Sequence, residues 1–184
     1  MQKETYTFGE YENLKQKYGN VASWVLWNND DETDPSIIEE NINLLNSRYV
    51  GLNISKPVTT WSNFRGGKHG RKIKRAFINT AIKGFYLTDF FKNIVEKDSS
   101  LIEQAIKKNE IDIEVHVEFF IEEMKNVKVN DETVFLTFGN LTYNLFDTYL
   151  KKYYPNNKVI LLKHYSARGT DEEWVQSTLE KIGL

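Results

Sequence analysis

Short apolar segments alternate with longer amphipathic segments along this chain of 184 residues, and that order limits the possible folds more than any other feature. The short segments are rich in β-branched and aromatic residues, which is typical of buried strands. They predict strands at 21–27, 48–53, 84–88, 133–138 and 158–163. Apolar residues at helical spacing predict helices at 8–18, 35–46, 71–80, 99–109, 112–126, 141–153 and 171–182. Strand followed by helix, repeated, favours a parallel sheet with helices on both faces.

We therefore predict a single α/β domain, residues 1–184, built as a three-layer α/β/α sandwich. Its central sheet should be mostly parallel, with four to five strands. In such sheets, ligands bind beyond the carboxyl ends of the strands. The segments expected there are 53–70, 89–93, 139–143 and 164–169. The first contains a connection of about twenty residues, and a loop of that length in a compact domain is usually functional.

Composition excludes several classes of site. The chain has no cysteine, which rules out disulfides, thiol nucleophiles, thiolate zinc sites and iron–sulfur clusters. Its three histidines lie far apart, and the acidic run 30–34 is interpreted as a loop and helix cap rather than a metal site. No apolar run could span a bilayer, and residues 1–20 carry no signal-peptide core. We expect a cytoplasmic monomer without membrane contact, metal or cofactor.

Charge is unevenly distributed along the chain. Between residues 41 and 88 there is no acidic residue, whereas nine basic ones occur. They are Arg48, Lys56, Arg65, Lys68, Arg71, Lys72, Lys74, Arg75 and Lys83. Because the formal net charge is −2 and this stretch contributes +9, the remainder carries −11. Such a stretch indicates either a polyanion-binding face or a solvated loop and helix.

Four segments at the predicted strand ends carry recognisable motifs. They are G-L-N-I-S (Gly51–Ser55), Y-L-T-D-F-F-K-N (Tyr86–Asn93), V-F-L-T-F-G-N (Val134–Asn140) and H-Y-S-A-R-G (His164–Gly169). In this order they resemble the motifs of the uracil-DNA glycosylase superfamily, among them G-[IM]-N-P-G, Y-[IL]-T-N-x-x-K-C and H-P-S. The resemblance extends from Tyr49 to Gly169. Three positions depart from it: Ile54 and Tyr165 replace prolines, and Asp89 replaces an asparagine.

The resemblance implies base excision from DNA, by hydrolysis of the N-glycosidic bond of a flipped base. Asn53 would position the attacking water, and His164 would donate a hydrogen bond to the leaving base. Phe64 would stack on the base, with Trp61 as the reserve candidate. From the residues alone, Asn53 could be a turn residue and His164 a polar residue beneath a loop, but their position at two strand ends favours function. Phe64 is equally a loop anchor in the core.

Base recognition would involve Asp89, Asn93 and Asn140. An ionised carboxylate only accepts hydrogen bonds, so Asp89 would not match the donor and acceptor that uracil presents. This favours a base other than plain uracil. Three alternatives remain: Asp89 is protonated by burial, it acts through a neighbour while Asn93 or Asn140 reads the base, or catalysis is lost.

The DNA, single- or double-stranded, would be held by residues that suit phosphate contacts. These are Ser55, Lys68, Arg71, Lys72, Arg75, Ser166 and Arg168. Two other functions fit the same sequence. One is a non-catalytic nucleic-acid or nucleotide-binding module on this scaffold, and the other is a small-molecule N-ribosyl hydrolase.

Overall fold

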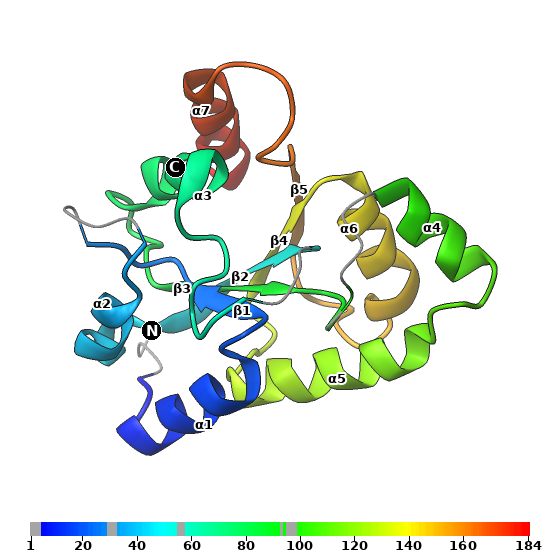
Figure 1. Ribbon diagram of the computed structural model, residues 1–184, viewed down its shortest axis with the longest axis horizontal. Helices are drawn as coiled ribbons and strands as arrows, with labels where there is room; N and C mark the ends of the chain where they lie inside the picture. The colour runs from blue at the N-terminus through cyan, green and yellow to red at the C-terminus, as the bar shows by residue number, and fades with distance from the viewer. Residues whose placement is uncertain (1–4, 29–32, 55–57, 93, 95–98) are drawn as a thin grey trace.

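The computed structural model describes residues 5–28, 33–54, 58–92, 94 and 99–184 (Figure 1). Within them, one mixed sheet has the strand order β1-β3-β2-β4-β5. The strands are β1 (Ala22–Trp24), β2 (Asn46–Asn53), β3 (Phe85–Asp89), β4 (Val134–Phe138) and β5 (Val159–Leu162). β3, β2, β4 and β5 run parallel, while β1 pairs antiparallel with β3 at one edge. The predicted α/β class is confirmed, and the antiparallel edge strand makes the sheet mixed.

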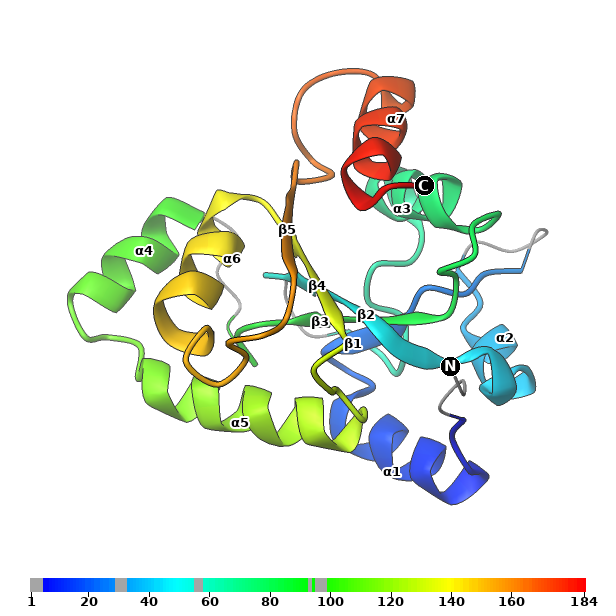
Figure 2. The ribbon, with the colours of Figure 1, turned by 180° about the vertical axis from the view of Figure 1, so that it is seen from behind.

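Helices cover both faces of this sheet. They are α1 (Phe8–Tyr18), α2 (Ser36–Glu40), α3 (Gly67–Phe77), α4 (Ser99–Lys107), α5 (Ile113–Asn126), α6 (Asn140–Leu145) and α7 (Asp171–Ile182), with a 3₁₀ turn η1 (Ile42–Leu44) and a π-helical turn η2 (Phe146–Leu150). Figures 1 and 2 show α3 beside α7 on one side of the sheet, and α1 and α5 on the other. The three layers follow from this arrangement.

The strands explain the layers, because each sends alternate side chains to opposite faces. In β3, Tyr86 packs in the core shared with α1, α4 and α5, whereas Phe85 and Leu87 pack in the core shared with α3 and α7. In β4, Phe135 and Leu136 divide in the same way. All of these side chains are fully buried, which accounts for the continuous apolar runs of the two strands.

The first and last helices along the chain, α1 and α7, have the predicted bounds because local capping defines where they begin. Thr7 and Thr170 each form a capping box with a glutamate three residues later, at the starts of α1 and α7. Elsewhere the helix bounds differ. The helix expected over 35–46 ends at Asn41, whose φ of −131° is not helical, and Asn46 already belongs to β2. The helix expected over 141–153 divides into α6 and η2.

α3 begins four residues earlier than the expected start at Arg71. Gly66 (φ 68°) turns the chain into the helix, and Gly70 lies in its first turn. A Cβ on Gly70 would lie 2.9 Å from the carbonyl oxygen of Phe64, so only glycine lets this turn pack on the preceding loop. Among the described residues, no helix is both long and apolar enough to cross a membrane.

Candidate functional site

The carboxyl ends of β2 and β5 bring Asn53 and His164 into direct contact. Asn53 is the last residue of β2, and His164 follows β5 by two residues. His164 Nε2 lies 3.0 Å from Asn53 Oδ1, although 111 residues separate them. Between them, β4 ends at Phe138, and a Cβ on the next residue, Gly139 (φ 93°), would lie 3.4 Å from the Cβ of His164. Asp89, at the end of β3, is the register partner of Asn53.

The hydrogen bonds of His164 define its tautomer. Its Nδ1 accepts the backbone N–H of Ser166 at 3.2 Å and lies 2.6 Å from Ser166 Oγ. A backbone N–H can only donate, so Nδ1 carries the lone pair and Nε2 carries the proton. Burial, with a smaller effect from His69, lowers the pKa of His164 from 6.5 to about 4. At neutral pH the ring is therefore an uncharged donor, with its N–H directed at Asn53 Oδ1.

Tyr165 completes the surroundings of Asn53. Asn53 Nδ2 donates to Tyr165 Oη at 2.7 Å, so both ends of this fully buried amide are engaged. The phenol ring lies 4.2 Å from the ring of His164, 5.5 Å from that of His69 and 5.9 Å from that of Phe138, measured between centroids. Burial, and then the charge of Asp89, raise the pKa of Tyr165 far above its ordinary value of 10. The phenol therefore keeps its proton.

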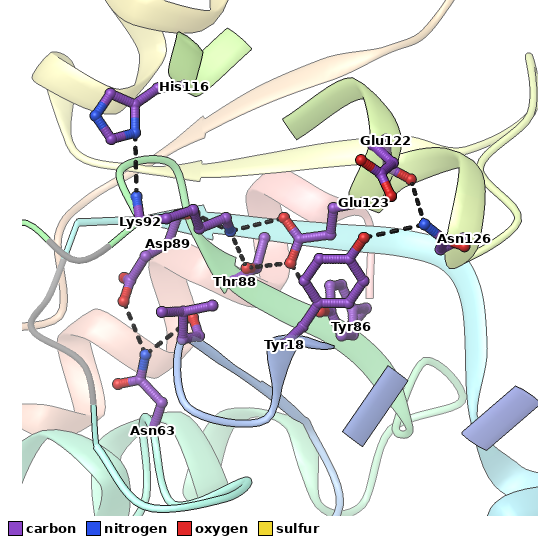
Figure 3. Close-up of polar contacts among 11 residues, drawn as sticks. Tyr18, Asn63, Tyr86, Thr88, Asp89, Lys92, His116, Glu122, Glu123 and Asn126 are labelled. Atoms are coloured by element: carbon purple, nitrogen blue, oxygen red, sulfur yellow. Dashed lines mark hydrogen bonds and ion pairs between the residues drawn. The ribbon is translucent and has the colours of Figure 1, made fainter. Parts of the chain in front are cut away.

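Asp89 is connected to the loop that carries Phe64. Its Oδ2 accepts a 2.8 Å hydrogen bond from Asn63 Nδ2, as Figure 3 shows, and Asn63 Oδ1 accepts the backbone N–H of Phe64 at 3.1 Å. Phe64 has a φ of 63°, a left-handed conformation that is unusual for a bulky residue. Asp89 therefore helps to hold the loop that carries Phe64.

The two candidate aromatic side chains have different surroundings. Phe64 is half-buried and packs against the core shared with α3 and α7. Trp61 is fully buried, and its indole N–H donates to Tyr11 Oη at 3.2 Å. Its carbonyl accepts the hydroxyl of Ser23 at 2.8 Å. Trp61 is therefore a loop anchor in the core, and this removes it as the reserve stacking residue.

A buried ion pair beneath the end of β3 was not anticipated from the sequence. Lys92 Nζ lies 2.6 Å from Glu123 Oε2 of α5, and Glu123 is fully buried (Figure 3). The hydroxyls of Tyr86 and Thr88 each donate to Glu123 Oε1 at 2.8 Å. The same ammonium also donates to Thr88 Oγ1 at 2.8 Å and to the carbonyl of Asp89. The network fastens the final residues of β3 to α5.

The predicted phosphate-binding residues separate into two groups. Lys72 is buried, with its Nζ 3.2 Å from Asp171 Oδ1, and Arg75 pairs with Glu172 at 2.6 Å. Including Lys72 in a cationic surface was therefore wrong, because its charge is enclosed between α3 and α7. Lys68 and Arg71 are exposed at the start of α3 and form no ion pair within the described part of the chain.

The remaining candidates lie at the rim of the site or beyond the described residues. Asn140 is exposed as the first residue of α6, and Arg168 is exposed on the turn after β5. Ser166 holds His164 in place, as given above. Ser55 and Asn93 lie outside the described residues, as does most of the acidic run 30–34.

Two other observations bear on the chemistry. In the part of the chain that the structure describes, no three histidine, aspartate or glutamate side chains are grouped so that they could hold a metal ion. A cavity of about 170 Å³ is lined by Val25, Leu26, Trp27, Ile78, Asn79 and Lys83. It lies near the start of β3, where Val25 donates to the carbonyl of Phe85, and thus at the opposite end of that strand from Asp89.

Comparison with known proteins gave no match to a family model, to a curated protein or to a solved structure.

Proposed function

We propose that this protein is a DNA glycosylase-like enzyme on a uracil-DNA glycosylase-like scaffold, hydrolysing the N-glycosidic bond of a flipped base. One observation carries the proposal: the 3.0 Å contact between Asn53 and His164 at the carboxyl ends of β2 and β5, across the end of β4. The motif resemblance assigns these two residues to opposite sides of one bond. Asn53 and His164 can act on one substrate only because the fold places the carboxyl ends of β2 and β5 close together.

The chemistry requires two events at the glycosidic bond. Water attacks C1′ of the sugar while the bond to the base breaks, and negative charge develops on the departing base. His164, neutral with its proton on Nε2, would donate that N–H to the base oxygen and stabilise the charge without transferring a proton. Asn53 Oδ1, which accepts this N–H in the unbound protein, would then accept a hydrogen bond from the attacking water. As the C1′–O bond forms, the water loses one proton to solvent, and the released base anion takes up one proton from solvent.

Base preference is the less familiar part of the proposal. Asp89 supplies only acceptors when ionised, and its Oδ2 already accepts from Asn63. We therefore propose a base other than plain uracil. Asp89→Asn keeps the size of the side chain and restores the residue of the resembled motif. The parent and this variant should release different bases from a panel of modified-base oligonucleotides, and identical profiles would remove Asp89 from recognition.

DNA binding would rest on Lys68 and Arg71 at the start of α3. They lie close in sequence to His69, whose ring contacts Tyr165 of the site. The logarithm of the DNA association constant falls linearly with the logarithm of salt concentration. For duplex DNA, each phosphate-neutralising cation that is removed makes this line less steep by about 0.9. In the variant Lys68→Ala/Arg71→Ala, the line should therefore be less steep by about two units. Arg75→Ala, which removes a cation paired with Glu172, is the matched control and should change the slope less.

The decisive experiment measures abasic sites in single- and double-stranded oligonucleotides that carry the base panel. The parent should generate them, and Asn53→Ala should reduce the rate by at least about 100-fold, as expected when a major transition-state interaction is removed. Asn157→Ala is the control for folding, because Asn157 is also a buried amide but bonds to Asn130 and Thr133, which lie before β4. Equal rates for Asn53→Ala and the parent would refute the proposal.

A second candidate function is a non-catalytic nucleic-acid or nucleotide-binding module on the same scaffold. The observation that favours it is the saturation of the Asn53 amide, which is fully buried and bonded at both ends. Salt-dependent DNA binding without base release from any oligonucleotide of the panel would support this function over the first.

A further inference from the structure

Tyr165 stands where the resembled motif has proline, and no role follows for it from that motif. In this chain its phenol oxygen is the hydrogen-bond partner of Asn53 Nδ2, at 2.7 Å. The residue is 8% exposed, and its ring packs on those of His164 and Phe138. The hydrogen bond therefore joins two residues of the site inside the protein rather than at its surface.

Ser166, His164, Asn53 and Tyr165 form a series of hydrogen bonds, and the donor and acceptor in each bond follow from the first one. The backbone N–H of Ser166 must donate to His164 Nδ1, which leaves the proton of the neutral ring on Nε2. That N–H needs an acceptor, so the oxygen of the Asn53 amide faces His164. The amide nitrogen then faces Tyr165, and the phenol oxygen has to accept. The donor in each bond therefore determines which atom must donate in the next bond.

Without the phenol oxygen, the amide nitrogen of Asn53 would be a buried donor facing an apolar ring. An unsatisfied buried donor is costly, so the amide would rotate or shift in search of a partner. Its oxygen would then leave the position from which it accepts the N–H of His164. The hydroxyl of Tyr165 thus acts on His164 through Asn53, in addition to the direct packing of the two rings.

We propose that Tyr165 is a positioning residue of this site, whose phenol oxygen holds the Asn53 amide so that Oδ1 faces the reacting groups. Its catalytic consequence rests on the proposed glycosylase function, whereas the positioning itself does not. Burial raises the pKa of Tyr165, so at neutral pH the phenol keeps its proton and its oxygen serves Asn53 Nδ2 as an uncharged acceptor.

The test compares two tyrosine-to-phenylalanine variants. Tyr165→Phe removes the hydroxyl and keeps the ring. Tyr18→Phe is the matched control, because Tyr18 is also 8% exposed and its Oη also accepts from an asparagine amide, Asn126 Nδ2 at 3.0 Å. Each variant lacks one asparagine–phenol hydrogen bond, and Tm should fall more in Tyr165→Phe, because Asn126 Nδ2 keeps its bond to the carbonyl of Glu122 at 2.9 Å whereas Asn53 is fully buried. Only Tyr165→Phe should affect the site.

Two readouts separate the positioning from the activity. In ¹⁵N NMR spectra, the Nε2 proton of His164 should exchange faster with water in Tyr165→Phe and at the parent rate in Tyr18→Phe. On the oligonucleotide that the parent cleaves best, kcat should fall by about 10- to 100-fold in Tyr165→Phe with KM little changed, as for a misplaced group. Tyr18→Phe should keep the parent kcat.

The outcomes are distinct. Unchanged His164 signals in Tyr165→Phe would overturn the positioning role, whatever the activity. Altered signals with no base release by the parent would leave the positioning role standing and remove the glycosylase function. Altered signals with an unchanged kcat in an active parent would overturn the catalytic consequence of the proposal.

Discussion

The Lys92–Glu123 pair offers a quantitative test of how the end of β3 is held. Lys92→Met removes the cation and leaves the fully buried carboxylate of Glu123 with only the hydroxyls of Tyr86 and Thr88. Breaking a buried ion pair in this way costs about 3–5 kcal/mol. Because two hydrogen bonds to the carboxylate remain, we expect about 3 kcal/mol, a large part of the roughly 5–15 kcal/mol that stabilises a typical domain.

The measurement is urea unfolding at about 25 °C followed by tryptophan fluorescence, with the free energy taken from midpoint and slope. Lys15→Met is the control, since Lys15 lies 2.7 Å from Glu39 but both side chains are partly exposed, at 32% and 46%. Such a surface pair contributes less than about 1 kcal/mol. Lys92→Met/Glu123→Gln should recover about 1 kcal/mol or more relative to Lys92→Met, because no lone charge remains. A destabilisation by Lys92→Met no larger than that by Lys15→Met would refute the argument.

Two further predictions concern stability. Burial lowers the pKa of His164 from 6.5 to about 4, so the folded state binds fewer protons than the unfolded state between these pH values. The contribution of His164 to the free energy of unfolding is therefore complete above pH 6.5 and is lost as the pH falls to 4. Between pH 4 and 7, the free energy of unfolding of His164→Gln should therefore depend less on pH than that of the parent. Parallel curves of unfolding free energy against pH for the two proteins would contradict this. Gly51→Ala would place a Cβ 2.5 Å from Leu87 Cδ1 in the packed centre of the sheet, at a cost of about 1–3 kcal/mol in urea unfolding. An unchanged midpoint would show that Leu87 moves aside freely.

The sequence predicts those parts of the fold that local chemistry defines. The bounds of α1 and α7 follow from threonine–glutamate capping boxes, which can be read directly from residues three apart. The placement of Asn53 and His164 at one edge of the sheet follows from a topological rule, because all parallel strands of a sheet have their carboxyl ends at the same edge. Their contact across the end of β4 depends on tertiary packing. Strand direction is different: three apolar or small residues in β1 carry no information about whether the strand runs parallel or antiparallel to its neighbour.

Buried charges are the main omission from the sequence-based prediction. The sequence favours a surface position for Lys72 and does not single out Glu123, because charged side chains are usually solvated. Glu123 nevertheless lies on the apolar stripe of α5, three residues after Phe120 and beside Met124, both of which are fully buried. A carboxylate at such a position indicates a buried partner. The identity of that partner depends on tertiary packing and could not be predicted.

Both polar atoms of the Asn53 side chain are held by two consecutive residues, His164 and Tyr165, on the turn that follows β5. Because the amide is fully buried and bonded at both ends, a ligand reaches Asn53 only after one of these two hydrogen bonds opens. The observed association rate should therefore level off at high ligand concentration, at the frequency with which that bond opens.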